Sequence, residues 1–431
     1  MCRFFYFLDY FFIFFSFENT YYNFFSIFLK SRLNKGLIAP KLFYMRKIFL
    51  LLHIVVCFSA FSQTHEKKVI LLDEDSNLPI DDAIVLVLKN KQVLMSNEEG
   101  VVSFEIKGGS NLKVTHSSYL PITIKWASLS QEENVFYMKS KLTGLDDIVI
   151  THKEPQEIIK ELVANSVKTL NVPARLKVYS REFFKLNDEY TYFADGLINF
   201  QLYKEEKKVK SVLLLEQNRS FGLVDDIDIA DLLGYNLNGM MEKYYMFSVL
   251  RPLLDDEIRK KYSFVVKVNA SNQDYNYIAA TPIVEGETDE ILDDFKIVYD
   301  VKKKLIVEVN AVASPATLRA IKENTAKGFR NIVKSEFKTQ YNCDLGNYYL
   351  ISSNEEIGFK VNAGNEVKNI EVINNLVTTN FNIQNFTYKE SQVFKDKTLF
   401  NAKDSILTEY WNISGLTPTA KEVEIINDIS K

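Results

Sequence analysis

Cysteine, histidine, glycine and proline are all scarce in this chain of 431 residues, which has three, four, 15 and nine of them. So little glycine and proline excludes a collagen-like or linker-type protein. Two of the cysteines, Cys2 and Cys57, lie in N-terminal segments that we expect the mature protein to lack. The remaining Cys343 cannot form an intrachain disulfide, even in an oxidising compartment. Its strand-like setting predicts a buried structural thiol.

The usual catalytic motifs are also missing. None of His65, His116 and His152 belongs to an HExxH or HxxE pair, which argues against a zinc site built from histidine and cysteine. No GxSxG nucleophile motif is present. Ser335 to Lys338 matches SxxK, but it falls in a predicted strand, whereas the Ser-Lys enzymes place that motif at the start of a helix. We therefore expect no catalytic residue, no cofactor and no metal.

The chain also has no large excess of positive or negative charge, since 52 basic and 56 acidic residues give a formal net charge of −4. A chain without a basic excess is not expected to bind nucleic acid. The hydrophobic fraction of 47% and the charged fraction of 25% are typical of globular proteins. The length predicts two or three domains.

The first 44 residues differ in composition from the rest of the chain. Fifteen of residues 1–28 are Phe or Tyr, and Asp9, Glu18 and Asn19 interrupt the apolar run. A membrane span needs about 20 continuous apolar residues. We interpret residues 1–44 as a mis-assigned upstream extension, with translation beginning at Met45.

Residues 45–62 have the order of a signal peptide. Arg46 and Lys47 precede an apolar stretch, and Ala60 and Ser62 are the small residues that a signal peptidase reads. This pattern predicts cleavage between Ser62 and Gln63 and no transmembrane span afterwards. An uncleaved anchor is the alternative. A lipoprotein signal at Cys57 is disfavoured by the bulky Val55 and Val56 before it. Removal of residues 1–62, which hold seven basic and two acidic groups, makes the chain more acidic.

Residues 66–140 are a series of short segments rich in β-branched residues, separated by turn residues. Such spacing is typical of a small antiparallel sandwich. The predicted strands are 69–72, 83–88, 92–96, 101–106, 111–116 and 122–126.

This module resembles the carboxypeptidase regulatory-like domain. The resemblance rests on Asp73 with Asn77-Leu78-Pro79-Ile80 and Ala83-Ile84-Val85, on Asn97-Glu98-Glu99-Gly100 with Phe104, on Val114 with Ser118-Tyr119, and on Leu145 to Ile150. The sequence departs from the family pattern by lacking glycine at positions 82 and 118. The resemblance implies a non-catalytic, transthyretin-like β-sandwich. Such domains are appended to carboxypeptidases, to outer-membrane transporters and to other exported proteins of Gram-negative bacteria.

After a linker at 141–154, residues 155–431 predict an α+β domain of mainly antiparallel strands. An amphipathic helix is expected at 155–171, with Pro155 in its first turn. Helical interruptions are expected near 225–235, 247–260 and 314–329. The predicted strands are 175–186, 190–203, 209–217, 262–269, 275–284, 295–299, 305–312, 334–341, 348–352, 367–386 and 388–394. The chain is thus predicted to be mainly β.

The end of the chain is similar to the close of a poorly characterised region that follows the regulatory-like domain in many exported proteins. The similarity rests on Tyr410-Trp411-Asn412 and Leu416-Thr417-Pro418-Thr419. By analogy, it implies a curved half-barrel for this domain.

Three acidic groups could act as acid and base or hold a cation, or they could simply lie at helix N-termini and in exposed loops. They are Asp225-Asp226-Asp228-Asp231, Asp255-Asp256-Glu257 and Glu287-Asp293-Asp294. Residues Asp73 to Asn77 are interpreted as a solvated turn rather than a calcium loop, because Leu78 and Ile84 stand where an EF-hand needs Gly and Glu.

These observations predict an exported protein, periplasmic or associated with the outer membrane. We expect it to be non-enzymatic, with a sandwich interaction module and a larger domain that binds an envelope protein or a lipid-like ligand. An accessory of an outer-membrane transport system and an envelope hydrolase using clustered carboxylates are the alternatives.

Overall fold

The computed structural model describes most of the chain after residue 64. The described ranges are 65–140, 153–222, 235–268, 274–320, 330–384 and 388–430, with internal gaps at 107, 131–132, 207, 285, 287–289, 344–345, 364–365, 397, 401, 403–404 and 406–414. The described residues belong to one compact unit, His65–Lys431. The predicted cleavage site at Ser62 and Gln63, the tail Leu145 to Ile150 and the acidic run 225–231 lie outside the described residues.

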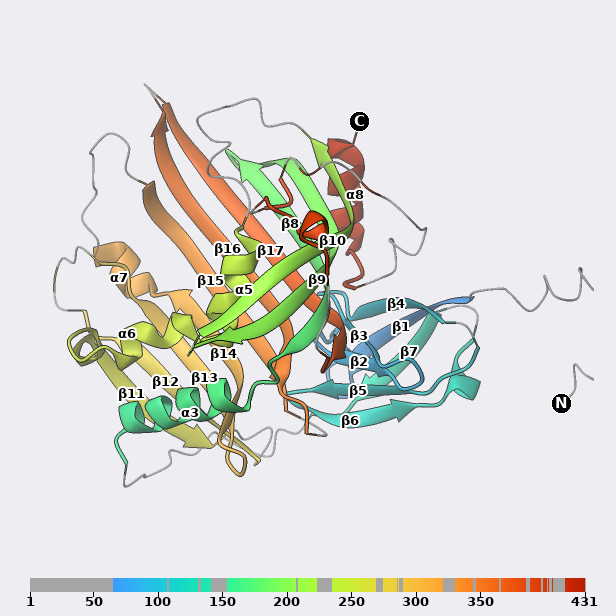
Figure 1. Ribbon diagram of the computed structural model, residues 1–431, viewed down its shortest axis with the longest axis horizontal. Coiled ribbons are helices and arrows are strands. Elements are labelled where there is room, and N and C mark those ends of the chain that lie inside the picture. The colour runs from blue at the N-terminus through green and yellow to red at the C-terminus, as the bar shows by residue number, and fades with distance from the viewer. Residues whose placement is uncertain are drawn as a thin grey trace, which may run out of the picture. The chain divides into compact units, whose positions relative to one another are not determined.

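The protein is mainly β, as the sequence predicts, and begins with two small sheets that face each other (Figure 1). One has the strand order β4-β1-β7 and the other β3-β2-β5-β6. All pairs are antiparallel except β1 with β7, a strand that the sequence did not indicate. The strands are β1 (His65–Asp73), β2 (Ile84–Val87), β3 (Gln92–Met95), β4 (Val101–Ile106), β5 (Leu112–His116), β6 (Tyr119–Ile124) and β7 (Glu133–Met138), and a 3-10 turn, η1 (Trp126–Ser128), precedes β7.

Two tight turns of the sandwich depend on left-handed backbone. Gly100 has φ +71°, and a Cβ there would lie 2.4 Å from the carbonyl oxygen of Leu71, so only glycine fits. Asp82 has φ +53° at the position where the family pattern carries glycine. Aspartate tolerates this region better than most residues, which allows the turn to form without the glycine.

The remaining strands form one ten-stranded antiparallel sheet in the order β10-β9-β8-β17-β16-β15-β14-β13-β12-β11. It consists of two meanders, β8 to β10 and β11 to β17, joined where the first strand pairs with the last. The strands are β8 (Ala174–Leu186), β9 (Glu189–Glu205), β10 (Lys208–Gly222), β11 (Tyr262–Val268), β12 (Tyr275–Pro282), β13 (Asp293–Asp300), β14 (Leu305–Ala313), β15 (Arg330–Asn342), β16 (Tyr349–Ala363) and β17 (Glu366–Asn382).

The turn between β8 and β9 is the one that the sequence predicts. Asn187 and Asp188 have φ values of +51° and +68°. Two consecutive left-handed residues are the mark of a type I′ hairpin, whose twist matches that of the strands.

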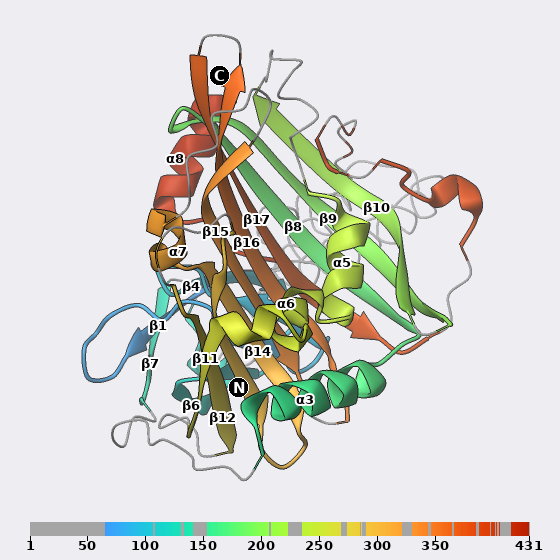
Figure 2. The ribbon, with the colours of Figure 1, turned by 90° about the vertical axis from the view of Figure 1, so that its left-hand side faces the viewer.

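Helices α3, α5 and α6 lie over one face of the sheet, here called the helix face (Figure 2). The predicted helix is observed as α3 (Pro155–Thr169), which packs on β14 through its buried Ile159 and Leu162. The connection from β10 to β11 must pass from one edge of the sheet to the other. Its described part carries α5 (Leu237–Tyr245), η2 (Ser248–Leu250), α6 (Arg251–Leu254) and η3 (Ile258–Lys261). The strand order thus explains why this face is covered by helices.

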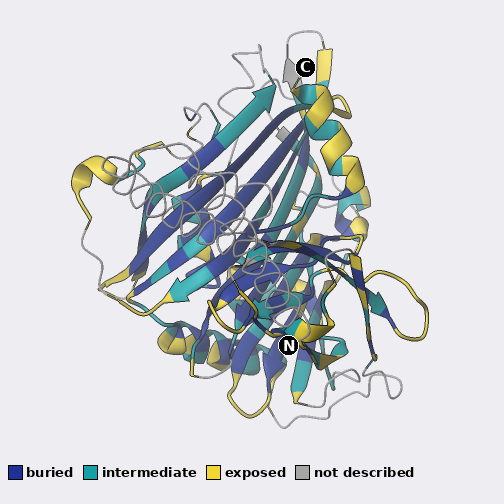
Figure 3. Cartoon of the chain, turned by 90° about the vertical axis from the view of Figure 1, so that its right-hand side faces the viewer, coloured by how far each residue is buried: buried dark blue, intermediate teal, exposed yellow. Residues whose placement is uncertain are grey.

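The opposite face of the sheet, here called the sandwich face, contacts β3 and the C-terminal helix α8 (Ala420–Ile429). Leu416 bridges to Met95, and both pack with Tyr179, Leu197 and Val377. Figure 3 shows the strands buried along their middles and α8 exposed on its outer side.

The segment before α8 is hydrogen-bonded to the sandwich. Asn97 Nδ2 donates to the Thr417 carbonyl at 3.2 Å, and the Ser103 N–H donates to Thr417 Oγ1 at 2.8 Å. The N–H of Ala420 donates to Glu99 Oε1 at 3.0 Å. The close at Leu416 to Thr419 therefore attaches the sandwich to the sheet.

Some predicted elements were wrong or incomplete. The strand predicted at 388–394 is instead a 3-10 turn, η4 (Glu390–Gln392), because Gln392 Oε1 accepts from the Lys389 N–H and closes the chain locally. Of the helical segment predicted at 314–329, α7 (Pro315–Ala320) is described. The helices α5 and α8 were not predicted, although Thr419 and Glu422 form a capping box before α8 that could have revealed it.

A search of the described residues for membrane-crossing helices gave no candidate of sufficient length and hydropathy.

Candidate ligand-binding site

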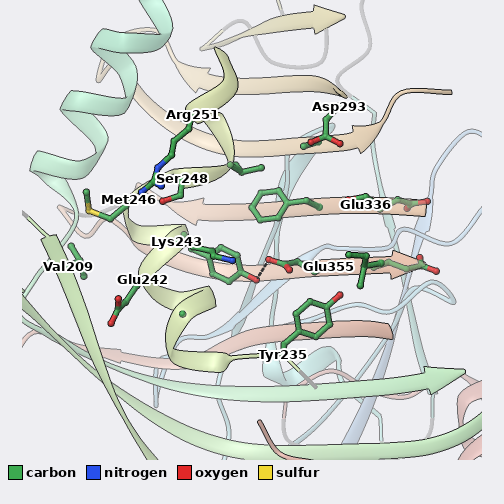
Figure 4. Close-up of a pocket in the computed structure, with 18 of the residues that line it drawn as sticks. Val209, Tyr235, Glu242, Lys243, Met246, Ser248, Arg251, Asp293, Glu336 and Glu355 are labelled. Carbon is green, nitrogen blue, oxygen red and sulfur yellow. Dashed lines mark hydrogen bonds between the residues drawn. The ribbon is translucent and has the colours of Figure 1, made fainter. Parts of the chain in front are cut away.

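A pocket of about 700 Å³ opens on the helix face, between the α5–α6 connection and strands β13 to β16 (Figure 4). Val209, Met246, Val249, Phe337 and Ile357 supply much of its apolar wall. Its other lining residues are Lys208, Lys210, Tyr235, Gly239, Glu242, Lys243, Tyr244, Ser248, Arg251, Asp293, Ala311, Ser335, Glu336, Glu355 and Glu356. The pocket has the size of a typical small-molecule site and a mixed lining.

Helix α5 forms the cover of this pocket, and its position follows from its own sequence. The Asn236 side chain accepts from the Gly239 N–H at 3.0 Å and caps the helix. Met240, Met241, Tyr244 and Tyr245 are buried. These side chains fix α5 on the sheet and direct the Tyr244 hydroxyl towards β16.

Strand pairing places four residues in one row across the helix face. Phe337 on β15 is opposite Glu355 on β16, Glu355 is opposite Asn374 on β17, and Asn374 is opposite Glu182 on β8. Directly paired residues of neighbouring strands point to the same face. Two carboxylates therefore lie on the same face, separated by a single strand and by the amide of Asn374.

Glu355 reaches the pocket and is held by a tyrosine. The Tyr244 hydroxyl donates to Glu355 Oε1 at 2.7 Å, as the dashed line in Figure 4 shows. Burial raises the pKa of Glu355, and the hydrogen bond from Tyr244 and the positive charge of Lys243 oppose this shift only in part. Within the described ranges, no Lys or Arg nitrogen lies within 4.0 Å of this carboxylate.

Glu182 is the second carboxylate of the row and is only 5% exposed. It accepts from the Tyr235 N–H at 3.1 Å and from Asn374 Nδ2 at 3.3 Å. Burial raises its pKa to about 7, despite these two hydrogen bonds. Again, no basic side chain of the described chain forms an ion pair with it.

Asn374 lies between the two carboxylates and is 1% exposed. Its Nδ2 donates to Glu182, whereas its Oδ1 is buried without a hydrogen-bond partner. A buried amide oxygen without a donor costs about 1–3 kcal/mol. The row therefore has spare acceptor capacity.

Basic side chains lie towards the outside of the pocket. Lys208, Lys243 and Arg251 are exposed, and Lys210 pairs with Glu242 at 3.2 Å. Figure 4 shows Arg251 and Glu355 at separate parts of the pocket wall.

The sandwich face of the same sheet also buries charge, but there the groups are paired. Arg219 donates to both oxygens of Asp195 at 2.9 and 3.0 Å, and the Tyr179 hydroxyl donates to Asp195 at 2.8 Å. Arg181, which is 2% exposed, pairs with Glu422 of α8 at 3.0 Å.

The structure separates the members of the SxxK match. Ser335 and Lys338 lie in β15, in a strand as predicted. Ser335 lines the pocket, whereas Lys338 points to the sandwich face and pairs with Asp82. Residues three apart on a strand project from opposite faces, so the two cannot act together.

Of the acidic groups singled out in the sequence, the structure describes Asp255 to Glu257 and Asp293 with Asp294, and of these Asp293 lines the pocket. Asp255 accepts from the N–H groups of Glu257 and Ile258, and these bonds lower its pKa. Asp255 thus lies at the start of η3, which is the helix N-terminal role that the sequence offered as the alternative to an acid, a base or a cation ligand. Asp293 lines the pocket, and burial, with a smaller effect of Asp294, raises its pKa to about 6. Glu287 lies outside the described residues.

The other residues singled out have structural roles. Cys343 is buried, as predicted. Asp73 accepts from the N–H groups of Asp75 and Ser76 and so closes a tight turn. His116 Nδ1 accepts from the Ser118 N–H in the β5–β6 turn.

Sequence reasoning missed Glu182, Asn374 and Glu355, although the two carboxylates leave a signal in the pattern of their strands. The inward positions of β8 are Leu176, Val178, Ser180, Glu182 and Phe184, and those of β16 include Ile351, Ser353, Glu355, Ile357 and Phe359. A carboxylate that follows the register of apolar residues is a mark of a buried acid.

No family model and no curated protein matches the chain. Among solved structures, it is similar to a LolA superfamily protein from Nitrosomonas europaea, with 8% identity and a TM-score of 0.23 over 53% of this chain and 94% of that one. It is also similar to lipovitellin, with 9% identity and a TM-score of 0.22 over 50% of this chain and 26% of that one. For the Pseudomonas aeruginosa MucA/MucB complex the identity is 9% and the TM-score 0.17, over 51% and 92%. Scores this low do not define a shared fold, and the function proposed below rests on the chain's own residues.

Proposed function

We propose that this protein is a non-enzymatic binding protein of the cell envelope, whose larger domain holds a lipid-like ligand on the helix face of its sheet. The observation that carries the proposal is the pocket of about 700 Å³ beneath α5. Its apolar wall, with Val209, Met246 and Phe337, suits a hydrocarbon chain, and its polar groups suit a head group.

The sandwich is proposed as an interaction module, in line with its resemblance to the regulatory-like domain. Strand β7 lies at an edge of its sheet, and it exposes Val135 and Tyr137 by 46% and 50%. Alternate apolar side chains on an edge strand suit the addition of a partner strand. An envelope protein, such as a component of an outer-membrane transport system, is the proposed partner.

The proposed location rests on the sequence of residues 45–62. A signal peptide cleaved after Ser62 would deliver the chain to the periplasm or to the outer membrane. Fractionation of the producing cell, with N-terminal sequencing of the recovered protein, tests this. Recovery of the chain in the cytoplasm with residues 45–62 still attached would contradict it.

Ligand binding can be tested with the full chain and dodecanol, a neutral amphiphile, by isothermal titration calorimetry. Ser335→Trp places a large side chain in the pocket, and we expect it to abolish binding. Val312→Trp is the matched control, because Val312 is 40% exposed on the neighbouring strand and does not line the pocket. Equal binding by both folded variants would overturn the proposed site.

A further inference from the structure

Charge on the helix face is distributed in a way that a lipid chain alone does not explain. Glu182 is buried and Glu355 is half-buried at the pocket wall, and within the described chain neither has a Lys or Arg nitrogen within 4.0 Å. Removing a carboxylate from water without a cationic partner is costly. Two such groups in one row are therefore an unusual arrangement for a purely structural face.

The neighbouring carboxylates of the same strands do not share this property. Glu356 on β16 pairs with Lys334, and Glu371 on β17 pairs with Lys185. Cations thus pair directly with adjacent positions of these strands. Glu355 has only the more distant charge of Lys243, and Glu182 has no basic partner within the described residues.

Asn374 adds an independent observation. Its amide turns Nδ2 towards Glu182 and so leaves Oδ1 turned away from that side chain, buried and without a donor. The row consequently offers carboxylate and amide oxygens. Of these oxygens, those of Glu355 line the pocket, so a ligand group that donates hydrogen bonds and carries positive charge would meet the row there.

Resting on the ligand-binding role proposed above, we infer that the ligand is an amphiphile with a protonated primary amine, which pairs with Glu355 at the inner wall of the pocket. An ammonium group has three donors and no acceptor, which matches a carboxylate that only accepts. The Tyr244 hydroxyl orients the Glu355 carboxylate, and the hydrocarbon chain lies along Phe337 and Ile357. The exposed Lys208 and Arg251 disfavour entry of the amine elsewhere along the rim.

The inference is tested with three probes that share one chain and differ in the head group. Dodecylamine, dodecanol and dodecanoate are titrated into the full chain below their critical micelle concentrations, at a pH of about 8. We expect dodecylamine to bind about 10- to 100-fold more tightly than dodecanol, since a charge-assisted hydrogen bond in a desolvated site has that effect. Dodecanoate should bind most weakly.

Two variants locate the preference. Glu355→Gln keeps the acceptor for Tyr244 and removes the charge, so it should abolish the preference for dodecylamine over dodecanol. Glu371→Gln, which removes a carboxylate from the sandwich face, should leave the preference unchanged.

Equal affinities for the amine and the alcohol in the unmodified protein would overturn the inference, and so would a preference that survives Glu355→Gln. A preference for dodecanoate would indicate that the rim lysines select the head group, which also overturns it. In each of these outcomes the proposed lipid-binding function still stands. Failure of all three probes to bind would instead reject the proposed function.

Discussion

The two faces of the ten-stranded sheet bury charge in opposite ways. On the sandwich face, Asp195 lies between Arg219 and Tyr179, and Arg181 is met by Glu422. On the helix face, Glu182 and Glu355 have only neutral donors in the described chain. The same strands, β8 and its neighbours, provide both arrangements.

This difference distinguishes charge that joins parts of the protein from charge kept for another purpose. The ion pair of Arg181 and Glu422 connects the sheet to α8, and the ion pair of Lys338 and Asp82 connects it to the sandwich. The helix-face carboxylates contact α5 and the residue before its cap, and they do so through neutral donors. Natural proteins depart from full pairing chiefly at functional sites.

The largest effect is expected from removing a buried carboxylate from the sandwich face. Asp195→Ala removes a fully buried carboxylate that accepts from Arg219 and Tyr179, and it should lower the free energy of unfolding by roughly 3–5 kcal/mol, since a buried ion pair loses one partner. Urea denaturation measures this. Glu257→Ala, which breaks an exposed pair with Lys260, is the control and should cost less than about 1 kcal/mol.

Removing the charge of a carboxylate on the helix face should instead raise the free energy of unfolding, and only at higher pH. The folded pKa of Glu182, about 7, lies above the ordinary value of 4.5, so the folded state holds its proton longer than the unfolded state. The stability that protonated Glu182 contributes is therefore fully present below a pH of about 4.5 and is lost as the pH rises towards 7.

Glu182→Gln removes this loss. It should stabilise the protein by an amount on the order of 3 kcal/mol at a pH of about 8 and have little effect at a pH of about 4. Urea midpoints at the two pH values check this. Glu371→Gln should instead destabilise the protein at a pH of about 8. Burial alone would raise the pKa of Glu371, but its pairing with Lys185 lowers it. A pH-independent effect of Glu182→Gln would contradict the assignment.

The contact between α8 and the sheet should have an intermediate effect. Glu422→Ala removes the partner of the buried Arg181 and also the capping box with Thr419, so a loss of about 2 kcal/mol is expected. Glu424→Ala in the same helix is the control. Loss of the helix by proteolysis at an unchanged urea midpoint would show that α8 does not stabilise the sheet.

The smallest effect is expected where the sandwich meets the sheet. Asp82→Asn keeps a residue that tolerates φ +53° and removes the charge that pairs with Lys338. Because both side chains are partly exposed, the loss should stay below about 1 kcal/mol and shrink in high salt. A loss that is larger and independent of salt would assign Asp82 to the buried class of pairs.

Local features of this fold could be predicted from the sequence, and non-local ones could not. Alternation and turn chemistry indicated most strands, the Asn187-Asp188 hairpin and helix α3. Nothing local indicates that β8 pairs with β17, because that contact joins residues about half the chain apart. The row of Glu355, Asn374 and Glu182 exists only through that pairing. The site could therefore not be predicted, even though each carboxylate stands at a position where its strand otherwise carries mostly apolar residues.

The pairing of β8 with β17 also has a consequence for how the chain folds. Hairpins β8 to β10 can form as soon as they are synthesised, but β8 keeps an open edge until residue 382 has emerged. Contacts of such high sequence separation form slowly, and an unpaired edge is open to the wrong partner during that time. The order of synthesis therefore leaves the middle of the sheet, where the candidate site lies, as the last part to form.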